Sequence, residues 1–285
     1  MEKTKIDSEE KTAEITGPFG GQILKMSALL ENKKILVTGG SSGLGLAMAE
    51  ALATAGASVL ITARSEEKIQ KALKGLKLLS STVYGLVMDV RSEPDIEQAV
   101  RWVKKEWATL DVLVNNAGIG MRTVNPSFLV DPQPFYKVTA EGFRDLVDTN
   151  LTGYFLVAKA FVPLFLEAGK GKIINISMNH ETMRRKGFVP YGPSRAGAES
   201  LSLIMAEDLK ENRIDVNMLL PGGATDTGMI PEEFKEEISR KFQLLSPQVM
   251  AAPIVFLSSD ESNGITGQRI VATEFEEWKK TILQP

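Results

Sequence analysis

Short apolar runs rich in β-branched residues recur along the chain from residue 33 onward. Their residues do not alternate between apolar and polar, a pattern typical of strands buried on both faces of a parallel sheet. Six runs are clear, and a seventh strand is expected near residues 269–272. The six lie at residues 35–37, 58–61, 83–87, 112–114, 173–176 and 216–220.

Amphipathic segments of helical length separate these runs, so that strand and helix alternate. They span residues 44–54, 66–79, 93–107, 140–167, 194–212 and 247–257. The alternation predicts an α/β fold, a doubly wound parallel sheet of the Rossmann type with right-handed crossovers. We expect a single domain at 31–275, with an N-terminal arm at 1–30 and a C-terminal tail at 276–285. The arm is either a surface tail or a segment that wraps a neighbouring subunit.

Composition limits the expected partners. A net charge of −3 and a pI near 5.5 give no electrostatic reason to expect nucleic acid or an anionic membrane. The chain has no cysteine, which excludes disulfides and thiolate metal sites and suits a cytoplasmic protein. We see no apolar run of the ~18–20 residues that a membrane span needs. We therefore expect a cytoplasmic protein that binds no metal, nucleic acid or membrane.

The first predicted strand leads directly into a glycine-rich turn and then a helix. Residues 38–45 read Thr-Gly-Gly-Ser-Ser-Gly-Leu-Gly. Glycines in such a turn let the backbone approach a pyrophosphate closely, and the helix N-terminus presents free N–H groups to the phosphates. The pattern predicts a dinucleotide site formed by Gly39, Ser41, Ser42, Gly43, Leu44 and Gly45.

The end of the second predicted strand indicates which dinucleotide binds. A protein selective for NAD usually has a carboxylate here, which accepts hydrogen bonds from the adenosine ribose hydroxyls. This chain has Ala63 followed by Arg64. A guanidinium holds the 2′-phosphate of NADP(H) by charge-assisted hydrogen bonds. We therefore predict NADP(H), with NAD(H) as second choice; the alternative is that Arg64 is a solvated residue at the start of a helix.

Four motifs together resemble the short-chain dehydrogenase/reductase family, whose active site reads Asn, Ser and Tyr-x-x-x-Lys. The motifs are the turn at 38–45, Asn115 to Gly118, Asn150, and Tyr191 with Arg195 four residues later. The resemblance covers residues 31–272. It implies further cofactor contacts from Asp89, Val90, Asn116, Ala117, Gly118, Tyr191, Arg195, Pro221, Gly222 and one or both of Thr225 and Thr227.

The resemblance also implies catalytic roles. Asn150 would hold a water of the proton relay from a local kink in its helix, and Tyr191 would be the acid in carbonyl reduction. A phenol with an ordinary pKa of about 10 donates poorly, and a cation one helical turn away lowers that pKa. Arg195 replaces the family's Lys and keeps the charge, but a guanidinium releases no proton at working pH. The alternative for Arg195 is to turn toward an acidic neighbour.

The family's serine position departs from the pattern as well. Residues 174–178 read Ile-Asn-Ile-Ser-Met, so Met178 occupies the expected place and Ser177 lies one residue early. A thioether donates no hydrogen bond to a substrate oxygen, and losing one oxyanion donor costs about 10²–10³ in rate. Ser177 compensates if the strand end bulges; the alternative is that Asn179 or His180 reaches in from the loop. Met178, Asn179 and His180, the only histidine, are expected to line the substrate pocket.

Two hypotheses for the function follow. The first is an NADP(H)-dependent oxidoreductase that transfers a hydride between nicotinamide and a carbonyl or alcohol substrate. Tyr191 would be its acid/base, with Asn150, Ser177 and Arg195 as partners. The second is an NADP(H)-binding relative with little or no turnover, a hypothesis motivated by Met178 and Arg195.

Two loops and two long helices bear on substrate and assembly. A proline-rich loop at 121–139 and a segment at 227–241 are expected to rim the substrate cleft.

In the family, two long helices, which correspond here to 140–167 and 194–212, pack against the same helices of neighbouring subunits. We therefore expect a homo-oligomer, a tetramer or a dimer.

Overall fold

The computed structural model describes residues 29–230, 233, 235–236 and 243–283, so most of the expected arm and part of the 227–241 segment lie outside the described residues. The strands are β1 (Lys34–Thr38), β2 (Ser58–Ala63), β3 (Val83–Val87), β4 (Val112–Asn115), β5 (Gly171–Ile176), β6 (Ile214–Leu220) and β7 (Arg269–Val271). The helices are α2 (Gly43–Thr54), α3 (Glu66–Leu79), α4 (Glu93–Trp107), α5 (Ala140–Val147), α6 (Gly153–Ala168), α7 (His180–Met183), α8 (Tyr191–Leu209), α10 (Ala251–Ser258) and α11 (Phe275–Leu283).

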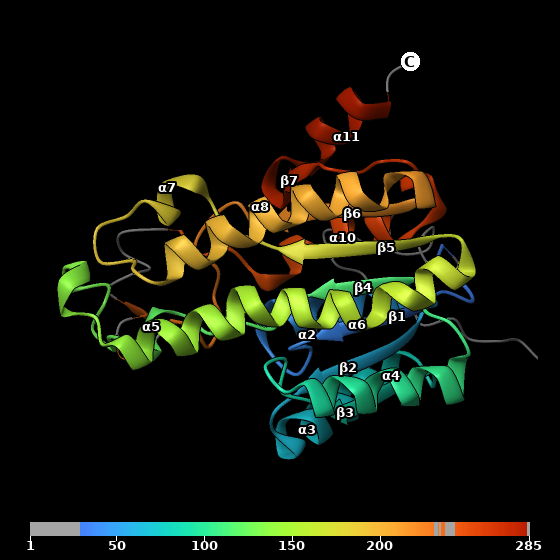
Figure 1. The fold of residues 1–285 in the computed structure, drawn as a ribbon, viewed down its shortest axis with the longest axis horizontal. Coiled ribbons are helices and arrows are strands. Elements are labelled where there is room, and N and C mark those ends of the chain that lie inside the picture. The colour runs from blue at the N-terminus through green and yellow to red at the C-terminus, as the bar shows by residue number, and fades with distance from the viewer. Residues whose placement is uncertain (1–28, 231–232, 234, 237–242, 284–285) are drawn as a thin grey trace, which may run out of the picture.

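The strands form one parallel sheet in the order β3-β2-β1-β4-β5-β6-β7 (Figure 1). The chain builds outward from β1 to one edge, returns to β4, and builds outward to the other edge. The doubly wound parallel sheet predicted from the apolar runs is confirmed. Its strand order reverses between β1 and β4, which is the point where such sheets bind ligands.

Helices cover both faces of the sheet. One face packs against α2, α3 and α10, and the other against α4, α6 and α8. Strand β1 shows why its run is continuously apolar: Ile35 and Val37 lie in the first core cluster, and Leu36 lies in the second. Successive strand residues point to opposite faces, so a strand buried on both sides needs apolar residues throughout.

The candidate motifs follow the carboxyl ends of the strands. The glycine-rich turn follows β1, Arg64 follows β2, Asn116 follows β4 and Ser177 follows β5. Carboxyl ends of parallel strands share one edge of the sheet. The topology therefore brings these segments, far apart in sequence, to one side of the molecule.

The long helix expected at 140–167 consists of α5, a π-helical turn at Asp148–Thr152, and α6. By length and composition, residues 140–168 would suffice to cross a membrane, so our expectation that no apolar run is that long was wrong. In this fold, however, α6 packs against α4, β4 and β5. Its apolar composition therefore supplies part of the core.

The chain end forms a helix where a tail was expected. The rings of Phe275 and Trp278 in α11 lie 5.6 and 6.1 Å from the ring of Phe256 in α10. At the other end, Leu30 was assigned to the arm, yet it is fully buried in the core. The packed unit therefore extends beyond both expected boundaries.

Candidate active site

The turn between β1 and α2 depends on glycine at specific positions. The φ angle is +64° at Gly39 and +54° at Gly43, a region that residues with a Cβ rarely adopt. A methyl group at Gly45 would collide with the carbonyl oxygen of Gly39 and the side-chain amide of Asn116. The glycines therefore allow close contact between the turn and the segment after β4.

Thr38 and Asn116 hold this turn against the end of β4. Oγ1 of Thr38 accepts hydrogen bonds from the backbone N–H groups of Asn116 (2.9 Å) and Ala117 (3.0 Å). Nδ2 of Asn116 donates to the carbonyl oxygens of Thr38 (2.8 Å) and Gly39 (3.2 Å). These four bonds fix the glycine-rich turn at 38–45 against the segment after β4; we call the surface that the two form the cradle.

The start of α2 fits a dinucleotide phosphate. Its N-cap residue, Ser42, makes no side-chain capping bond, and the first turn contains no acidic residue. The first N–H groups of the helix are thus left for a ligand, and the helix dipole favours an anion there. Together with the glycine cradle, this arrangement fits the pyrophosphate of NAD(P)(H).

Two residues assigned to the adenosine half of the cofactor differ in their surroundings. Arg64 is exposed and has no hydrogen bond or ion pair within the described part of the chain. The carboxylate of Asp89 instead accepts bonds from Nε (3.0 Å) and Nη2 (2.6 Å) of Arg91, which keep the pKa of Asp89 below its ordinary value. An adenine amino group would therefore share Asp89 with Arg91. Val90 is buried.

The loop after β6 distinguishes the two candidate threonines. Thr225 is buried, and its hydroxyl donates to the carbonyl oxygen of Gly223 at 3.3 Å. Thr227 lies over the glycine-rich turn, since a Cβ at Gly43 would be 3.3 Å from its side chain. Thr227 is therefore the better placed of the two toward the cradle. Gly222, with φ +98°, turns the chain after Pro221.

Asn150 lies in the π-helical turn, so the predicted kink is present. The residue is fully buried. Its Oδ1 accepts from the backbone N–H of Ile119 and its Nδ2 donates to the carbonyl oxygen of Ile119, both at 2.9 Å. Such π-turns occur frequently at functional sites. The paired bonds fix the amide against the loop after β4, next to Gly118.

Tyr191 begins α8, and Arg195 lies one turn later, directed into the protein. Its guanidinium carbon is 5.5 Å from the ring centroid of Tyr191 and 5.4 Å from that of Tyr154. Nη1 donates to the phenolic oxygen of Tyr154 (2.7 Å) and to the carbonyl oxygen of Ile176 (2.8 Å). The alternative of an acidic partner for Arg195 was wrong. The guanidinium lies between two aromatic rings instead.

The charge of Arg195 is buried but not weakened. Burial acts to lower the pKa of the guanidinium, yet the phenols of Tyr154 and Tyr191 outweigh this effect and raise that pKa above its ordinary value. Burial also raises the pKa of Tyr154, against the opposing charge of Arg195. A methyl group at Gly118 would lie 2.5 Å from Nη2 of Arg195. A permanent cation is thus held between the Tyr191 ring and the loop after β4.

The phenol of Tyr191 borders an apolar cluster. The cluster contains Met121, Phe128, Leu146, Met178 and Phe188. Phe128 of the proline-rich loop meets Phe188 edge to face at 5.6 Å. The phenolic oxygen of Tyr191 lies 3.9 Å from the sulfur of Met229. Thioethers and aromatic rings therefore form much of the wall near this phenol.

Ser177 bonds to a carboxylate on α8. Its Oγ donates to Oε1 of Glu199 at 2.5 Å. Glu199 also accepts from Nε of Arg269 (2.9 Å) and pairs with Nε2 of His180 (3.0 Å). Nη2 of Arg269 donates to the carbonyl oxygen of Met178 at 2.8 Å, which ties the end of β5 to β7. Within the described residues, no group of three His, Cys, Asp or Glu side chains could hold a metal ion.

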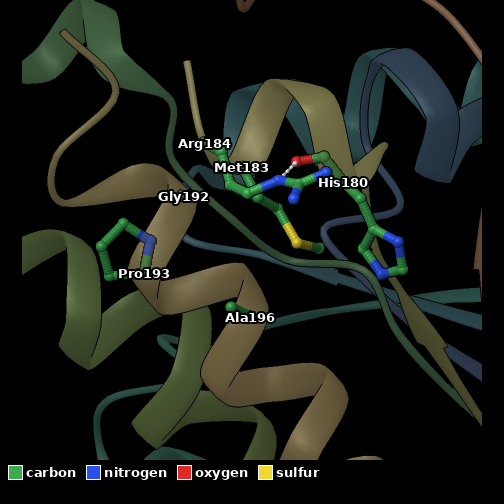
Figure 2. A pocket seen from close by; sticks show the side chains of 6 residues that line it. All are labelled: His180, Met183, Arg184, Gly192, Pro193 and Ala196. Carbon is green, nitrogen blue, oxygen red and sulfur yellow. Dashed lines mark hydrogen bonds between the residues drawn. The ribbon is translucent and has the colours of Figure 1, made fainter. Parts of the chain in front are cut away.

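A pocket of about 390 Å³ lies between α7 and the start of α8 (Figure 2). It is lined by His180, Met183, Arg184, Gly192, Pro193 and Ala196. Nε of Arg184 donates to the carbonyl oxygen of His180 at 3.3 Å, as Figure 2 shows. Of the three predicted pocket residues, His180 lines this space. Met178 lies in the apolar cluster, and Nδ2 of Asn179 donates to the carbonyl oxygen of Gly222 at 2.9 Å.

Three polar residues of this region were not predicted: Tyr154, Glu199 and Arg269. Tyr154 follows Asn150 by four positions, and Glu199 follows Arg195 by four. Helical spacing from the candidate residues was therefore a usable signal for both. No pattern in the sequence connects Arg269 with the end of β5, because that contact depends on the pairing of β6 with β7.

A dinucleotide cradle at the switch point of a parallel sheet, with a phenol and a cation nearby, defines the class of nicotinamide-dependent oxidoreductases. The family model described as short chain dehydrogenase matches residues 33–238 of this chain. The chain belongs to this family, whose members act on alcohol and carbonyl groups.

Known proteins of the same family are similar over nearly the whole chain. Gluconate 5-dehydrogenase from Gluconobacter oxydans is 28% identical over 246 residues, which cover 84% of this chain and 92% of that protein. The 3-oxoacyl-(acyl-carrier-protein) reductase of Thermotoga maritima is 31% identical, over 85% of this chain and 96% of its own. A solved structure of a variant actinorhodin polyketide ketoreductase with NADPH has a TM-score of 0.73 at 28% identity, covering 84% of this chain and 95% of that one.

Proposed function

We propose that this protein is an NADP(H)-dependent reductase of carbonyl compounds, or an alcohol dehydrogenase in reverse, with Tyr191 as the acid/base. The observation that carries the proposal is the position of the Arg195 guanidinium, 5.5 Å from the Tyr191 ring on the following helical turn. A bound nicotinamide would supply or accept the hydride. The side chains would then handle the proton and the charge that develops on the substrate oxygen.

The proton step belongs to Tyr191. In reduction its phenol donates a proton to the developing alkoxide, which leaves a phenolate beside Arg195. The buried positive charge attracts that phenolate, and this attraction is stronger at a low local dielectric than it would be in bulk water. Arg195 keeps its own protons, so we infer that Tyr191 regains its proton from water that reaches the phenol, without relay through residue 195.

Cofactor preference follows from the strand ends. Ala63 offers no carboxylate to a ribose diol, whereas Arg64 is exposed and unpaired within the described residues. These features favour the 2′-phosphate of NADP(H). The similarity to a ketoreductase solved with NADPH agrees with this choice. Asn116 and Gly118 would border the cofactor from β4, and Thr227 would border it from the loop after β6.

Substrate preference follows from the wall near Tyr191. Met178, Met229 and Phe188 offer apolar contacts and no hydrogen-bond donor from their side chains. We infer an apolar ketone, aldehyde or quinone as substrate, reduced more slowly than by a site with a serine donor.

The test is NADPH oxidation with a panel of ketones, aldehydes and quinones, comparing the parent protein with Tyr191→Phe. We expect the variant to bind NADPH as the parent does and to lose carbonyl reduction, because only the transferable proton is removed. Tyr84→Phe, on β3, is the matched control and keeps the parent rate. Equal rates for the parent and Tyr191→Phe would contradict the assignment of the acid.

A second function is favoured by three specific hydrogen bonds. The hydroxyl of Ser177 is engaged by Glu199 and is not free to donate to a substrate, and Nη1 of Arg195 is engaged by Tyr154 and Ile176, which leaves only part of the guanidinium for the cofactor. A protein that binds NADP(H) for structure or sensing, with little turnover, would have such a site. Tight NADPH binding with no oxidation across the panel would support it.

We also propose a homo-oligomer. Exposed apolar residues lie on the two long helical segments: Phe143, Phe155, Leu166, Leu203 and Ile204. Of the small residues on α8, Ala196 is exposed, whereas Ala198 is buried within the chain and is not available to a partner. The cytoplasmic location stays a prediction.

A further inference from the structure

Arg195 is a buried cation whose position depends on few polar contacts. The residue is 3% exposed, and within the described residues Nη1 donates two hydrogen bonds, while the phenol of Tyr191 also interacts with the guanidinium. Its Nε is buried and has no partner within the described part of the chain. A buried charge normally needs close, well-placed partners to offset the loss of water. The two acceptors at Nη1, together with the rings of Tyr154 and Tyr191, therefore hold this guanidinium in place.

One of those acceptors is a side chain from another helix. Tyr154 of α6 is 1% exposed, and its phenolic oxygen accepts from Nη1 at 2.7 Å. The same phenol donates to the carbonyl oxygen of Ile176 at 3.1 Å. The hydroxyl thus accepts from the cation and donates to the carbonyl that the cation also contacts. The phenol of Tyr154 therefore uses its oxygen as an acceptor for Arg195 and its O–H as a donor to Ile176, so both of its hydrogen-bonding functions are satisfied.

From this geometry we infer that Tyr154 is the positioning residue of the active site, which holds the Arg195 guanidinium against the Tyr191 ring. Tyr154 touches Arg195 and not the reacting atoms, so it acts through Arg195 alone. The inference rests on the proposed function for its catalytic consequence, but the Tyr154–Arg195 contact itself does not depend on turnover.

The geometry also accounts for the Arg at a family Lys position. A guanidinium presents a planar fork, so Nη1 reaches Tyr154 and Ile176 while Nη2 stays beside Gly118 and near Asn150. A single ammonium has no second nitrogen to place at the other position. Without the Tyr154 hydroxyl, the carbonyl oxygen of Ile176 would be the remaining acceptor at Nη1. The cation would then be free to leave the Tyr191 ring.

The experiment is a double-mutant cycle with the full-length protein: parent, Tyr154→Phe, Arg195→Met and the double variant. Tyr154→Phe removes one oxygen and keeps the buried ring. Tyr84→Phe is the matched control. Two measurements are made on each protein, urea unfolding for the midpoint and steady-state NADPH oxidation for kcat and the KM for NADPH. The oxidation uses phenanthrenequinone, or the panel compound that the parent reduces fastest. Should Arg195→Met fail to fold, Arg195→Gln takes its place.

We expect Tyr154→Phe to lower kcat about tenfold or more and to leave the KM for NADPH within about twofold, because a lost bond to a charged group releases Arg195 from Tyr191. In the Arg195→Met background the same substitution should change the rate by less than about twofold. The urea midpoint should fall on Tyr154→Phe in the parent background and hardly change in the Arg195→Met background.

Equal effects of Tyr154→Phe in both backgrounds, on rate and on midpoint, would overturn the inference, as would a parent-like kcat in Tyr154→Phe. If the parent reduces no compound of the panel, the proposed function fails. The unfolding cycle then decides alone whether Tyr154 holds Arg195. A cycle without coupling refutes the pair, and a coupled cycle supports it.

Discussion

The hydroxyl of Ser177 donates a 2.5 Å hydrogen bond to the carboxylate of Glu199, one helical turn beyond Arg195 on α8. Since this hydroxyl has a charged, mostly buried partner, we expect Ser177→Ala to keep the rate of hydride transfer within about threefold of the parent. Its free energy of unfolding should fall by about 1–3 kcal/mol, because Glu199 loses a donor. Single-turnover kinetics and urea denaturation measure the two effects. A rate lowered by two orders of magnitude would mean that Ser177 reaches the substrate after all.

Met178 stands where the family has its serine donor. Met178→Ser should raise the rate of carbonyl reduction, up to the factor of about 10²–10³ that one oxyanion donor is typically worth. Met178→Ala is the matched control, because it removes the same bulk without adding a hydroxyl. Equal rates in the serine and alanine variants would contradict the view that a missing donor limits this site.

Arg64 should decide between the two nicotinamide cofactors. Arg64→Ala should weaken NADPH binding by about 1.5–3 kcal/mol, the usual worth of hydrogen bonds to charged groups, and should leave NADH binding unchanged. Titration of nucleotide fluorescence gives both affinities, with Lys68→Ala on the neighbouring helix as a control for general charge. Equal losses for both nucleotides would refute the contact with the 2′-phosphate.

Lys172 on β5 should make stability depend on pH. Its Nζ donates to Oγ of Ser262 (2.6 Å) and lies 3.8 Å from the carboxylate of Asp215. Burial lowers the pKa of Lys172 from 10.5 to about 8. Between about pH 8 and pH 10.5 the unfolded chain therefore binds more protons at Lys172 than the folded one does, so the free energy of unfolding rises with pH. The stability gained in this way is lost again as the pH falls through 8.

The interval from about 8 to 10.5, at ~1.36 kcal/mol per pH unit, sets an upper limit of about 3 kcal/mol on this rise. In Lys172→Met the rise should be absent. Urea denaturation of parent and variant between about pH 7 and pH 9.5 makes the comparison, and tyrosines, which begin to titrate at its upper end, contribute equally in the two proteins. Parallel pH profiles for the two proteins would contradict the assignment to Lys172.

The exposed apolar surface of α8 should mediate assembly. Leu203 and Ile204 are 49% and 57% exposed. We expect the parent to sediment as a tetramer or dimer at micromolar concentration, and Ile204→Glu to shift it toward the monomer because a charge would be buried at the contact. Leu78→Glu, at an exposed position on α3, is the control and should keep the parent mass. A monomeric parent would rule out the assembly.

The sequence predicts which turns and helices form the site, but not which partners its side chains contact. The glycine turn, the kink at Asn150 and the helical pair Tyr191–Arg195 were predictable, because each depends on residues close together in sequence. The strand order was also predictable, since continuous apolar runs separated by helices leave few topologies.

The direction of Arg195 and the partner of Ser177 were not predictable. Arg195 points inward because Tyr154 from α6 and the carbonyl oxygen of Ile176 from β5 meet at one place. Ser177 faces Glu199, whose carboxylate is also held by Arg269 from the last strand. Each arrangement joins side chains from several elements, so it depends on packing that no local pattern in the sequence contains.

The π-helical turn at Asp148–Thr152 has a consequence for the rotation of α6. A π-turn adds one residue to a helix, and one residue in an α-helix corresponds to about 100° around its axis. Deleting a residue there would turn the whole of α6 relative to α5 and carry Tyr154 away from Arg195. The rotation of α6 about its axis therefore links the position of the Asn150 amide to that of Tyr154, which contacts the Arg195 guanidinium. Point substitutions elsewhere in α6 leave this rotation unchanged.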